Sequence, residues 1–228
     1  MKPKALVLQA HGSNRDFDVM EALTLAGADA SGIPLNELRM NKTLLADFQL
    51  LVLPGGFSYA DALGAGKLLA LDLASYFADE IAAFVDSGKP VIGICNGFQA
   101  LVKSGILPGD NVVARRSEAT PRNDMSVTLT FNAQGHFECC WIYLKPVSQK
   151  CIWTKDLSDN ITCPVAHGEG NFQTTELFPF LLSSKTVKSP LPTPTPMAYP
   201  PTENIRSIRM VLFSISQVFV TRKAMYWD

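Results

Sequence analysis

The sequence has no long apolar run. Runs such as Ala5–Leu8 and Leu50–Leu53 are far shorter than the roughly 20 apolar residues that a membrane-spanning helix needs. The start, Met-Lys-Pro-Lys, leads directly into a strand-like segment, without the apolar stretch and small-residue cleavage site of a signal peptide. We therefore expect no membrane partner and a cytoplasmic location.

An excess of either charge is also absent. The 20 Lys and Arg residues face 21 Asp and Glu residues, so no overall basic field would attract nucleic acid. Cysteines are odd in number and no C-x-x-C pair occurs, which favours free thiols in a reducing compartment and disfavours structural zinc. We expect neither a nucleic-acid partner nor a metal site. The cysteines are Cys95, Cys139, Cys140, Cys151 and Cys163.

Buried-strand patterns alternate with helical patterns in the first half of the chain. Apolar residues make up 47% of the sequence, which is enough for a sizeable core. Continuous apolar runs predict strands buried on both faces, whereas apolar residues three to four positions apart predict helices. The alternation predicts a doubly wound, mostly parallel α/β sheet with ligand-binding loops after residues 9, 54 and 95. The expected strands are 4–9, 35–39, 49–54 and 89–95, and the expected helices are 16–26, 77–85 and 97–103, with another beginning near residue 67.

The second half of the chain changes character twice. Segments 125–131, 137–144 and 161–166 have the patterns of strands separated by turns, which predicts an antiparallel extension. From Leu177 onward six basic residues stand against two acidic ones, and six of the 15 prolines lie between Pro190 and Pro201. Such proline density blocks helices and central strands. We predict a domain over 1–176 and a divergent, poorly ordered, Pro-rich tail over 177–228.

The sharpest local motif is G-x-C-x-G, from Gly93 to Gly97, between a predicted strand and a predicted helix. This is the arrangement of a nucleophile elbow, with cysteine in place of serine. A thiol at a helix N-terminus is expected to gain thiolate character, and the N–H of Asn96 could stabilise an oxyanion. The alternative is a small structural cysteine that ends a strand. The two flanking glycines favour a catalytic Cys95.

A second motif, Pro54-Gly55-Gly56, directly follows another predicted buried strand. Its backbone N–H groups could supply the other half of an oxyanion hole beside Cys95. Without the elbow, Pro-Gly-Gly would indicate only a turn.

A nucleophilic cysteine needs a base, and the chain has three histidines: His11, His136 and His167. His11 follows the first predicted strand, and His136 falls in a predicted hairpin turn. His167 and Glu169 are two residues apart, so in an extended segment both side chains face the same way. This pair is either a base with its orienting acid or part of a glycine-rich binding loop.

Three segments together resemble the class I glutamine amidotransferases. They are 53–59 (Leu-Pro-Gly-Gly-Phe-Ser-Tyr), 93–99 (Gly-Ile-Cys-Asn-Gly-Phe-Gln) and 166–172 (Ala-His-Gly-Glu-Gly-Asn-Phe), in the family's order and spacing. The resemblance is strongest to the glutaminase subunits of phosphoribosylformylglycinamidine synthases, in purine biosynthesis. It covers about three-quarters of the chain, up to roughly residue 176.

This resemblance implies a flavodoxin-like sheet and hydrolysis of glutamine through a thioester on Cys95. The ammonia would pass to a synthetase partner, which uses ATP and Mg²⁺ to convert formylglycinamide ribonucleotide to the amidine; a small third subunit usually joins the complex. No cofactor is implied for this chain itself. The residues implied in oxyanion stabilisation and glutamine binding are Gly55, Gly56, Phe57, Asn96 and Gln99.

One departure from the family pattern concerns the base. Members carry a His-Pro-Glu stretch near the C-terminus, and no histidine follows His167 here. We interpret the tail as a reading-frame change or a divergent replacement, which translating the other frames past codon 176 tests. Three alternatives remain open: rescue of the base by His167 with Glu169, a catalytically dead binding subunit of the synthetase, and a DJ-1/PfpI-type hydrolase. The last is disfavoured because that type commonly has histidine where Asn96 stands.

Overall fold

The computed structural model describes residues 1–107, 127–144, 152–154 and 156–174. None of the helices within these residues is long and apolar enough to cross a membrane. The elements of the first part are β1 (Lys4–Gln9), α1 (Asp16–Leu25), β2 (Asp29–Pro34), α2 (Leu35–Met40), η1 (Lys42–Asp47), β3 (Leu50–Leu53), η2 (Ser58–Asp61), α3 (Lys67–Tyr76), α4 (Ala78–Asp86), β4 (Val91–Gly93) and α5 (Asn96–Lys103). They are followed by β5 (Val127–Thr130), β6 (Glu138–Leu144), β7 (Ile161–His167) and β8 (Asn171–Thr174).

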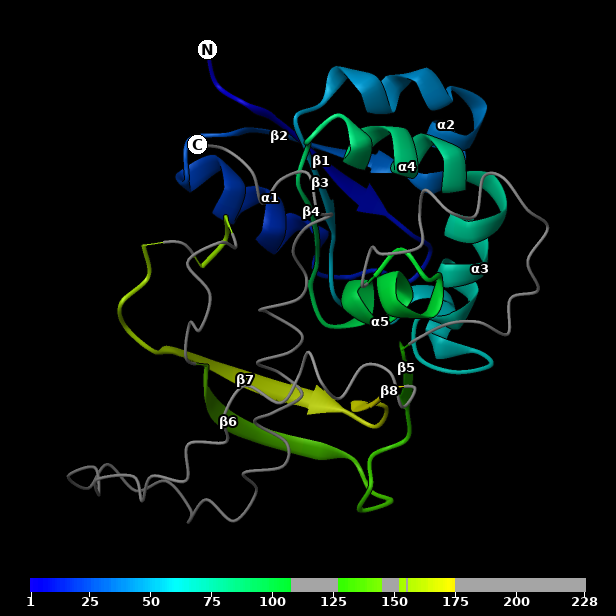
Figure 1. Ribbon diagram of the computed structural model, residues 1–228, viewed down its shortest axis with the longest axis vertical. Coiled ribbons are helices and arrows are strands. Elements are labelled where there is room, and N and C mark those ends of the chain that lie inside the picture. Colours follow the sequence, from blue (N-terminus) through cyan, green and yellow to red (C-terminus); the bar gives the residue numbers. More distant parts are fainter. Residues whose placement is uncertain (108–126, 145–151, 155, 175–228) are drawn as a thin grey trace.

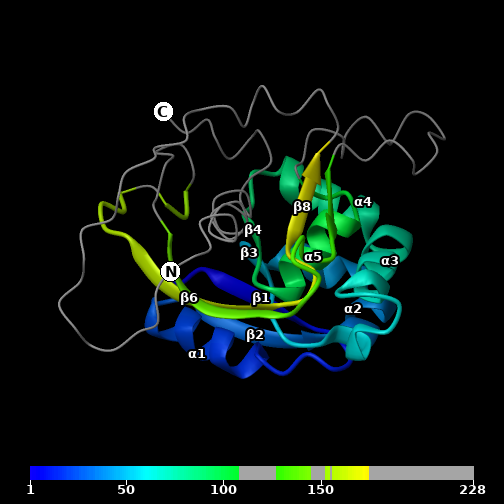
Figure 2. The same cartoon turned by 90° about the horizontal axis from the view of Figure 1, so that it is seen from below.

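The first four strands form a parallel sheet in the order β2-β1-β3-β4. Helix α1 lies on one side of this sheet, and α2, α3 and α4 lie on the other (Figures 1 and 2). The predicted α/β class is therefore confirmed, and the strand order is that of flavodoxin-like folds. The chain leaves β1 for β2 on one side and returns to β3 on the other, so the switch point lies between the carboxyl ends of β1 and β3.

The predicted antiparallel extension is also present, as two separate pairs. Strand β5 pairs with β8 and β6 pairs with β7, both antiparallel. In Figure 1 the β6–β7 pair lies away from the parallel sheet, whereas β5 and β8 lie below α5. The predicted tail lies outside the described residues.

The core forms between the sheet and the helices as the apolar pattern predicts. Leu6 and Leu53 have no exposed surface, and the stripe on α4 is buried throughout. Burying one such aliphatic side chain contributes about 1.5–3 kcal/mol. Helix α1 differs from expectation, because Val19 and Leu23 are only half-buried and Ala26 is exposed.

One predicted strand is wrong. Residues 35–39 form helix α2, and the strand beside β1 is Asp29–Pro34 instead. This edge strand is mostly polar or small, so it carries no buried-strand signal. Leu35 and Leu38, read as part of a strand, are three apart and bury one side of a helical turn.

The loop between β3 and α3 contains an unusual run of left-handed backbone. Tyr59, Ala60 and Asp61 have φ angles of 54°, 53° and 52°. A non-glycine residue in this region costs roughly 1–2 kcal/mol. Tertiary contacts hold the run: the Tyr59 N–H donates to the carbonyl of His11 and the Tyr59 hydroxyl donates to Asp72.

We predict that Ala60→Gly stabilises the protein by roughly 0.5–1 kcal/mol. Removing the Cβ relieves the strain at φ 53°, and the extra flexibility of glycine in the unfolded chain offsets part of the gain. The midpoint of urea denaturation measures the effect.

The matched control is Gly27→Ala. Gly27 has φ 94°, and an added Cβ would meet no atom within 4 Å, so only backbone strain is introduced. We expect a loss of about 1 kcal/mol. An Ala60→Gly variant no more stable than the parent would show that the 59–61 run is unstrained.

Candidate active site

The loops after β3 and β4 meet at the carboxyl edge of the sheet. An ideal Cβ on Gly55 would lie 3.3 Å from the Cβ of Cys95 and 3.5 Å from the carbonyl oxygen of Ile94. Strand β4 is tied to β3 at this point, because the Ile94 N–H donates to the carbonyl of Leu53 at 3.0 Å. The structure thus brings the glycine turn and the candidate nucleophile side by side.

Cys95 occupies a strained turn between β4 and α5. Its φ and ψ are 51° and −110°, a conformation that L-residues rarely adopt. The flanking glycines are required by close packing: a Cβ on Gly97 would lie 2.2 Å from the carbonyl oxygen of Leu53, and one on Gly93 would lie 2.7 Å from the nitrogen of Phe98. This is the geometry of a nucleophile elbow, in which the residue after the nucleophile opens a helix.

Cys95 is an exposed residue, but the protein packed around its sulfur raises the pKa of the thiol. Burial of the sulfur by the surrounding protein raises the pKa of Cys95 above its usual 9.0, the N–H of Asn96 lowers it, and the carboxylate of Asp61 raises it further. The helix terminus is expected to lower the pKa of this thiol, but the sum of the three effects raises it. One amide hydrogen bond does not outweigh desolvation combined with a nearby anion.

Asn96 itself is buried, with 2% of its surface exposed, and its side chain anchors the elbow. Its Oδ1 accepts hydrogen bonds from the N–H and hydroxyl of Ser58, at 3.1 and 2.5 Å. Its Nδ2 donates to Asp61 at 2.8 Å and to Gln99 at 3.2 Å. Each polar atom of this buried amide has a partner, so the start of α5 is fixed to the loop after β3.

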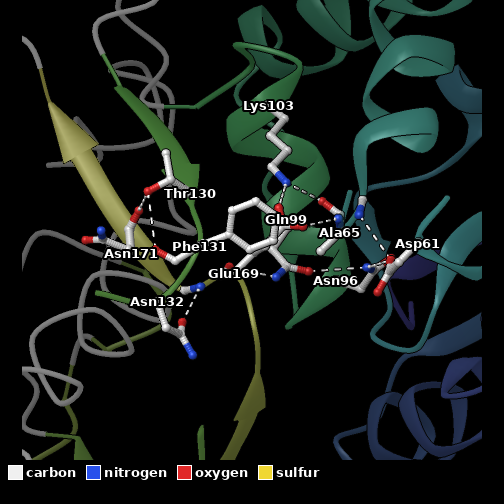
Figure 3. A network of polar contacts seen from close by, with 12 residues as sticks. Asp61, Ala65, Asn96, Gln99, Lys103, Thr130, Phe131, Asn132, Glu169 and Asn171 are labelled. Carbon is white, nitrogen blue, oxygen red and sulfur yellow. Dashed lines mark hydrogen bonds and ion pairs between the residues drawn. The ribbon is translucent and has the colours of Figure 1, made fainter. Parts of the chain in front are cut away.

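Farther along α5, the same network reaches the turn between β7 and β8 (Figure 3). Gln99 Nε2 donates to the carbonyl of Glu169 at 2.9 Å. The carboxylate of Glu169 accepts from the N–H of Ala65 at 2.9 Å and pairs with Lys103 at 2.5 Å. Burial raises the pKa of Glu169, but these hydrogen bonds and the charges of Lys103 and Lys67 outweigh it, so the pKa is lowered overall.

His167 has a different partner from Glu169. Its Nδ1 lies 3.0 Å from Oδ1 of Asn132, and its Nε2 is buried without a hydrogen-bond partner among the described residues. Burial lowers the pKa of His167, which the Glu138 carboxylate and a backbone hydrogen bond only partly oppose. In the part of the chain that the structure describes, no hydrogen bond links His167 to Cys95 or to the carboxylate of Glu169. Their role as base and orienting acid stays a prediction.

The other predicted residues lie around the elbow. Gly56 has φ 125° and bridges to Ser13, and Phe57 is 56% exposed beside it. The imidazole of His136 is largely exposed, 3.6 Å from Glu138. Within the described ranges, no group of three or more His, Cys, Asp or Glu residues could hold a metal ion.

Sequence reasoning missed four residues that build the site: Ser58, Asp61, Lys103 and Asn132. Lys103 could have been found from its spacing. It lies seven residues after Asn96, so positions 96, 99 and 103 fall on the same side of a helix. The partners Asp61 and Asn132 carry no signal in the sequence, because long-range packing brings them in.

The parallel sheet, its switch point and the elbow define a class of α/β proteins in which a cysteine stands at a strained strand-to-helix turn. The family model for the CobB/CobQ-like glutamine amidotransferase domain matches residues 2–187, so the chain belongs to this family. The match confirms the resemblance to glutamine amidotransferases that the three motifs indicate. It therefore argues against the alternative of a DJ-1/PfpI-type hydrolase.

Within this family, the chain is similar to subunits of one kind of synthase. The chain is 56% identical over 177 residues to "phosphoribosylformylglycinamidine synthase subunit PurQ" of Treponema denticola, covering 76% of this chain and 65% of the relative. It is 44% identical over 172 residues to the protein of the same name from Dehalococcoides mccartyi, covering 74% and 62%. The chain therefore spans less than two thirds of the length of these relatives. A solved structure, PurLQS from Thermotoga maritima, matches with a TM-score of 0.56 and 32% identity, covering 77% of this chain and 71% of that one.

We predict that Cys95 alkylates with a higher pH midpoint in the folded protein than in the urea-denatured chain, because burial and Asp61 both raise the pKa of its thiol. Asp61→Asn removes a negative charge and keeps an oxygen acceptor for Asn96, so it should lower the midpoint by a few tenths of a pH unit. The rate of iodoacetamide labelling of the Cys95 peptide, followed by mass spectrometry from pH 6 to 10.5, measures both.

The control is Asp47→Asn, which removes the same charge from an exposed position before the other end of β3. It should leave the midpoint unchanged. A midpoint in the folded parent no higher than in the denatured chain, or equal shifts in the two variants, would contradict the assigned causes.

Proposed function

We propose that this chain hydrolyses glutamine and supplies ammonia for the conversion of formylglycinamide ribonucleotide to formylglycinamidine ribonucleotide. The observation that carries the proposal is the elbow. A strained, solvent-exposed Cys95 precedes a helix N-terminus, and the Gly55-Gly56 turn lies against it. The names of the relatives support the choice of reaction within the family.

The chemistry follows from this geometry. The sulfur of Cys95 attacks the side-chain carboxamide carbon of glutamine, its proton passes to water, and the carbonyl becomes an oxyanion. The N–H groups of Asn96 and Gly56 stabilise that charge. The C–N bond then breaks, the nitrogen takes a proton from water and leaves as ammonia, and a γ-glutamyl thioester remains. Water hydrolyses the thioester to glutamate and regenerates the thiol.

Recognition of glutamine falls in this proposal to the residues around the thiol. Phe57 is exposed at the start of the loop after the glycine turn, and Gln99 lies one helical turn beyond Cys95. The side chain of Gln99 is already bonded to Asn96 and to the backbone of Glu169, so it presents a fixed polar surface rather than a mobile one.

A synthetase subunit is the proposed consumer of the ammonia. The relatives are named as subunits, and the solved structure with a similar chain is a PurLQS assembly. We propose that the synthetase holds the ATP and Mg²⁺, that a small third subunit completes the complex, and that the complex works in the cytoplasm. This chain requires no cofactor of its own in the proposed reaction.

A second candidate function is a binding subunit without turnover. Two observations favour it. The pKa of Cys95 is raised, so less of the thiol is ionised. His167 bonds to Asn132, and among the described residues no hydrogen bond joins a histidine to the thiol. Loss of the base from a catalytic triad lowers kcat by several orders of magnitude, while the oxyanion hole and substrate binding survive. The two candidates therefore differ in turnover and agree in glutamine binding.

We predict that a chloroketone analogue of glutamine labels Cys95 and that glutamine protects it. The sulfur displaces chloride from the methylene carbon, so no general acid is needed and the thiol proton passes to water. Mass spectrometry of the full chain checks this, with Cys95→Ser as the unreactive control. Absence of glutamine-protected labelling would refute both candidate functions.

Turnover separates the candidates. For a chain that hydrolyses glutamine without a triad base, we expect a glutaminase rate above the blank, about 10³-fold or more below that of an enzyme with an intact triad, and unchanged in His167→Ala. For a binding subunit without turnover, the rate equals the blank. The release of glutamate, measured with the synthetase subunit present, checks this, with Cys95→Ala as the blank. A rate that falls to the blank in His167→Ala would instead establish His167 as the base.

A further inference from the structure

We propose that Lys103 and Glu169 are a positioning pair that fixes the rotation of α5, and with it the direction of the Asn96 N–H at the thiol. The proposal rests on the proposed function, because it assigns to that N–H the stabilisation of the oxyanion. Neither residue touches the thiol, so both act through the elbow helix.

One side of α5 is polar although it is packed against protein. Asn96, Gln99 and Lys103 follow at intervals of three and four residues, which places them on one face. Asn96 and Gln99 are buried, and the side chain of Lys103 is 12% exposed. Figure 3 shows this face turned toward Asp61, Ala65 and Glu169. A helix whose buried side is polar is oriented by specific hydrogen bonds, whereas an apolar side permits small rotations.

The bonds at the far end of this face form a closed set. Lys103 Nζ donates to the carbonyl of Ala65 at 2.7 Å and pairs with Glu169 at 2.5 Å. The N–H of Ala65 donates to the other carboxylate oxygen at 2.9 Å. One lysine and one carboxylate thus join three separate segments: α5, the loop before α3, and the β7–β8 turn.

The other end of this face, at Asn96, lies next to the thiol of Cys95. The side chain of Asn96 is tied to Ser58 and Asp61, and its backbone N–H acts on the sulfur of Cys95. A donor stabilises an oxyanion only when it lies about 2.7–3.1 Å from it, so a displacement of about 0.5–1 Å removes much of the effect. Two anchor points, one at each end, are what prevents a two-turn helix from rotating about its axis.

The ion pair is suited to this role by its burial. Glu169 is 14% exposed and its pKa is lowered, so it remains a carboxylate at neutral pH. Removing one partner from a buried pair leaves the other charge uncompensated, which shifts the surrounding segments. By contrast, Lys42 and Glu80 form a pair at 3.0 Å with side chains 41% and 27% exposed, which joins η1 to α4. That pair is the matched control.

The test compares two electrophiles on the full chain. The chloroketone analogue of glutamine has a carbonyl that the oxyanion N–H groups can polarise, whereas iodoacetamide reports chiefly the thiolate fraction and access. We expect Glu169→Gln and Lys103→Met to lower the maximal rate of chloroketone inactivation about tenfold, with little change in its half-saturating concentration. At each pH, the rate of iodoacetamide labelling should stay within twofold of the parent's rate, with the same pH midpoint. Lys103→Arg, which keeps the charge and donors, should retain the parent's rate within about threefold.

Glu80→Gln makes the same chemical change in the control pair and should match the parent with both electrophiles. Equal chloroketone rates in Glu169→Gln and Glu80→Gln, with the parent labelled normally, would overturn the positioning role and leave the proposed function standing. A parent that the chloroketone does not label would overturn the proposed function itself. Parallel losses with both electrophiles would show a general structural role and would also overturn the proposal. If Lys103→Met does not fold, Glu169→Gln alone decides, because it keeps the shape and the acceptor for Ala65.

Discussion

The contact between Gly97 and the carbonyl of Leu53 is the constraint on which the site depends. Helix α5 begins so close to β3 that a single added carbon would lie 2.2 Å from that oxygen. This approach forces the chain to turn sharply at Cys95, and the turn leaves this residue exposed above the sheet edge. The glycine turn after β3 occupies the adjacent position, because β3 and β4 are neighbouring strands. Backbone packing alone thus brings together Cys95, the candidate nucleophile, and the glycine turn proposed to supply an oxyanion donor.

Much of this arrangement could be predicted from the sequence. The apolar runs of β1, β3 and β4 and the glycines at 93 and 97 locate the sheet edge and the elbow, because both signals are local. The edge strand β2 could not be found, because its exposed positions carry polar or small residues. The pattern of residues 35–39 predicts a strand where helix α2 forms, because a six-residue helix is too short to show the periodicity of a helix.

The electrostatics of the site were the least predictable part. A helix N-terminus suggests an acidic thiol, but the net effect depends on burial and on Asp61, which is 34 residues away in the chain. Likewise, the spacing of His167 and Glu169 suggests a catalytic pair, whereas packing gives each residue its own partner, Asn132 for one and Lys103 for the other. Local pattern predicts where a strand ends; it does not predict which charges other segments bring to that end. The structure therefore retains the framework of an amidotransferase site around a thiol that is not activated by the described residues.

The most direct test of this account is a crystal structure of the full chain after reaction with the chloroketone analogue of glutamine. The account predicts a covalent bond to Sγ of Cys95, with the adduct's carbonyl oxygen within hydrogen-bond distance of the N–H groups of Asn96 and Gly56. An adduct whose oxygen points into solvent, away from both amides, would contradict the assignment of this elbow as an amide-cleaving site.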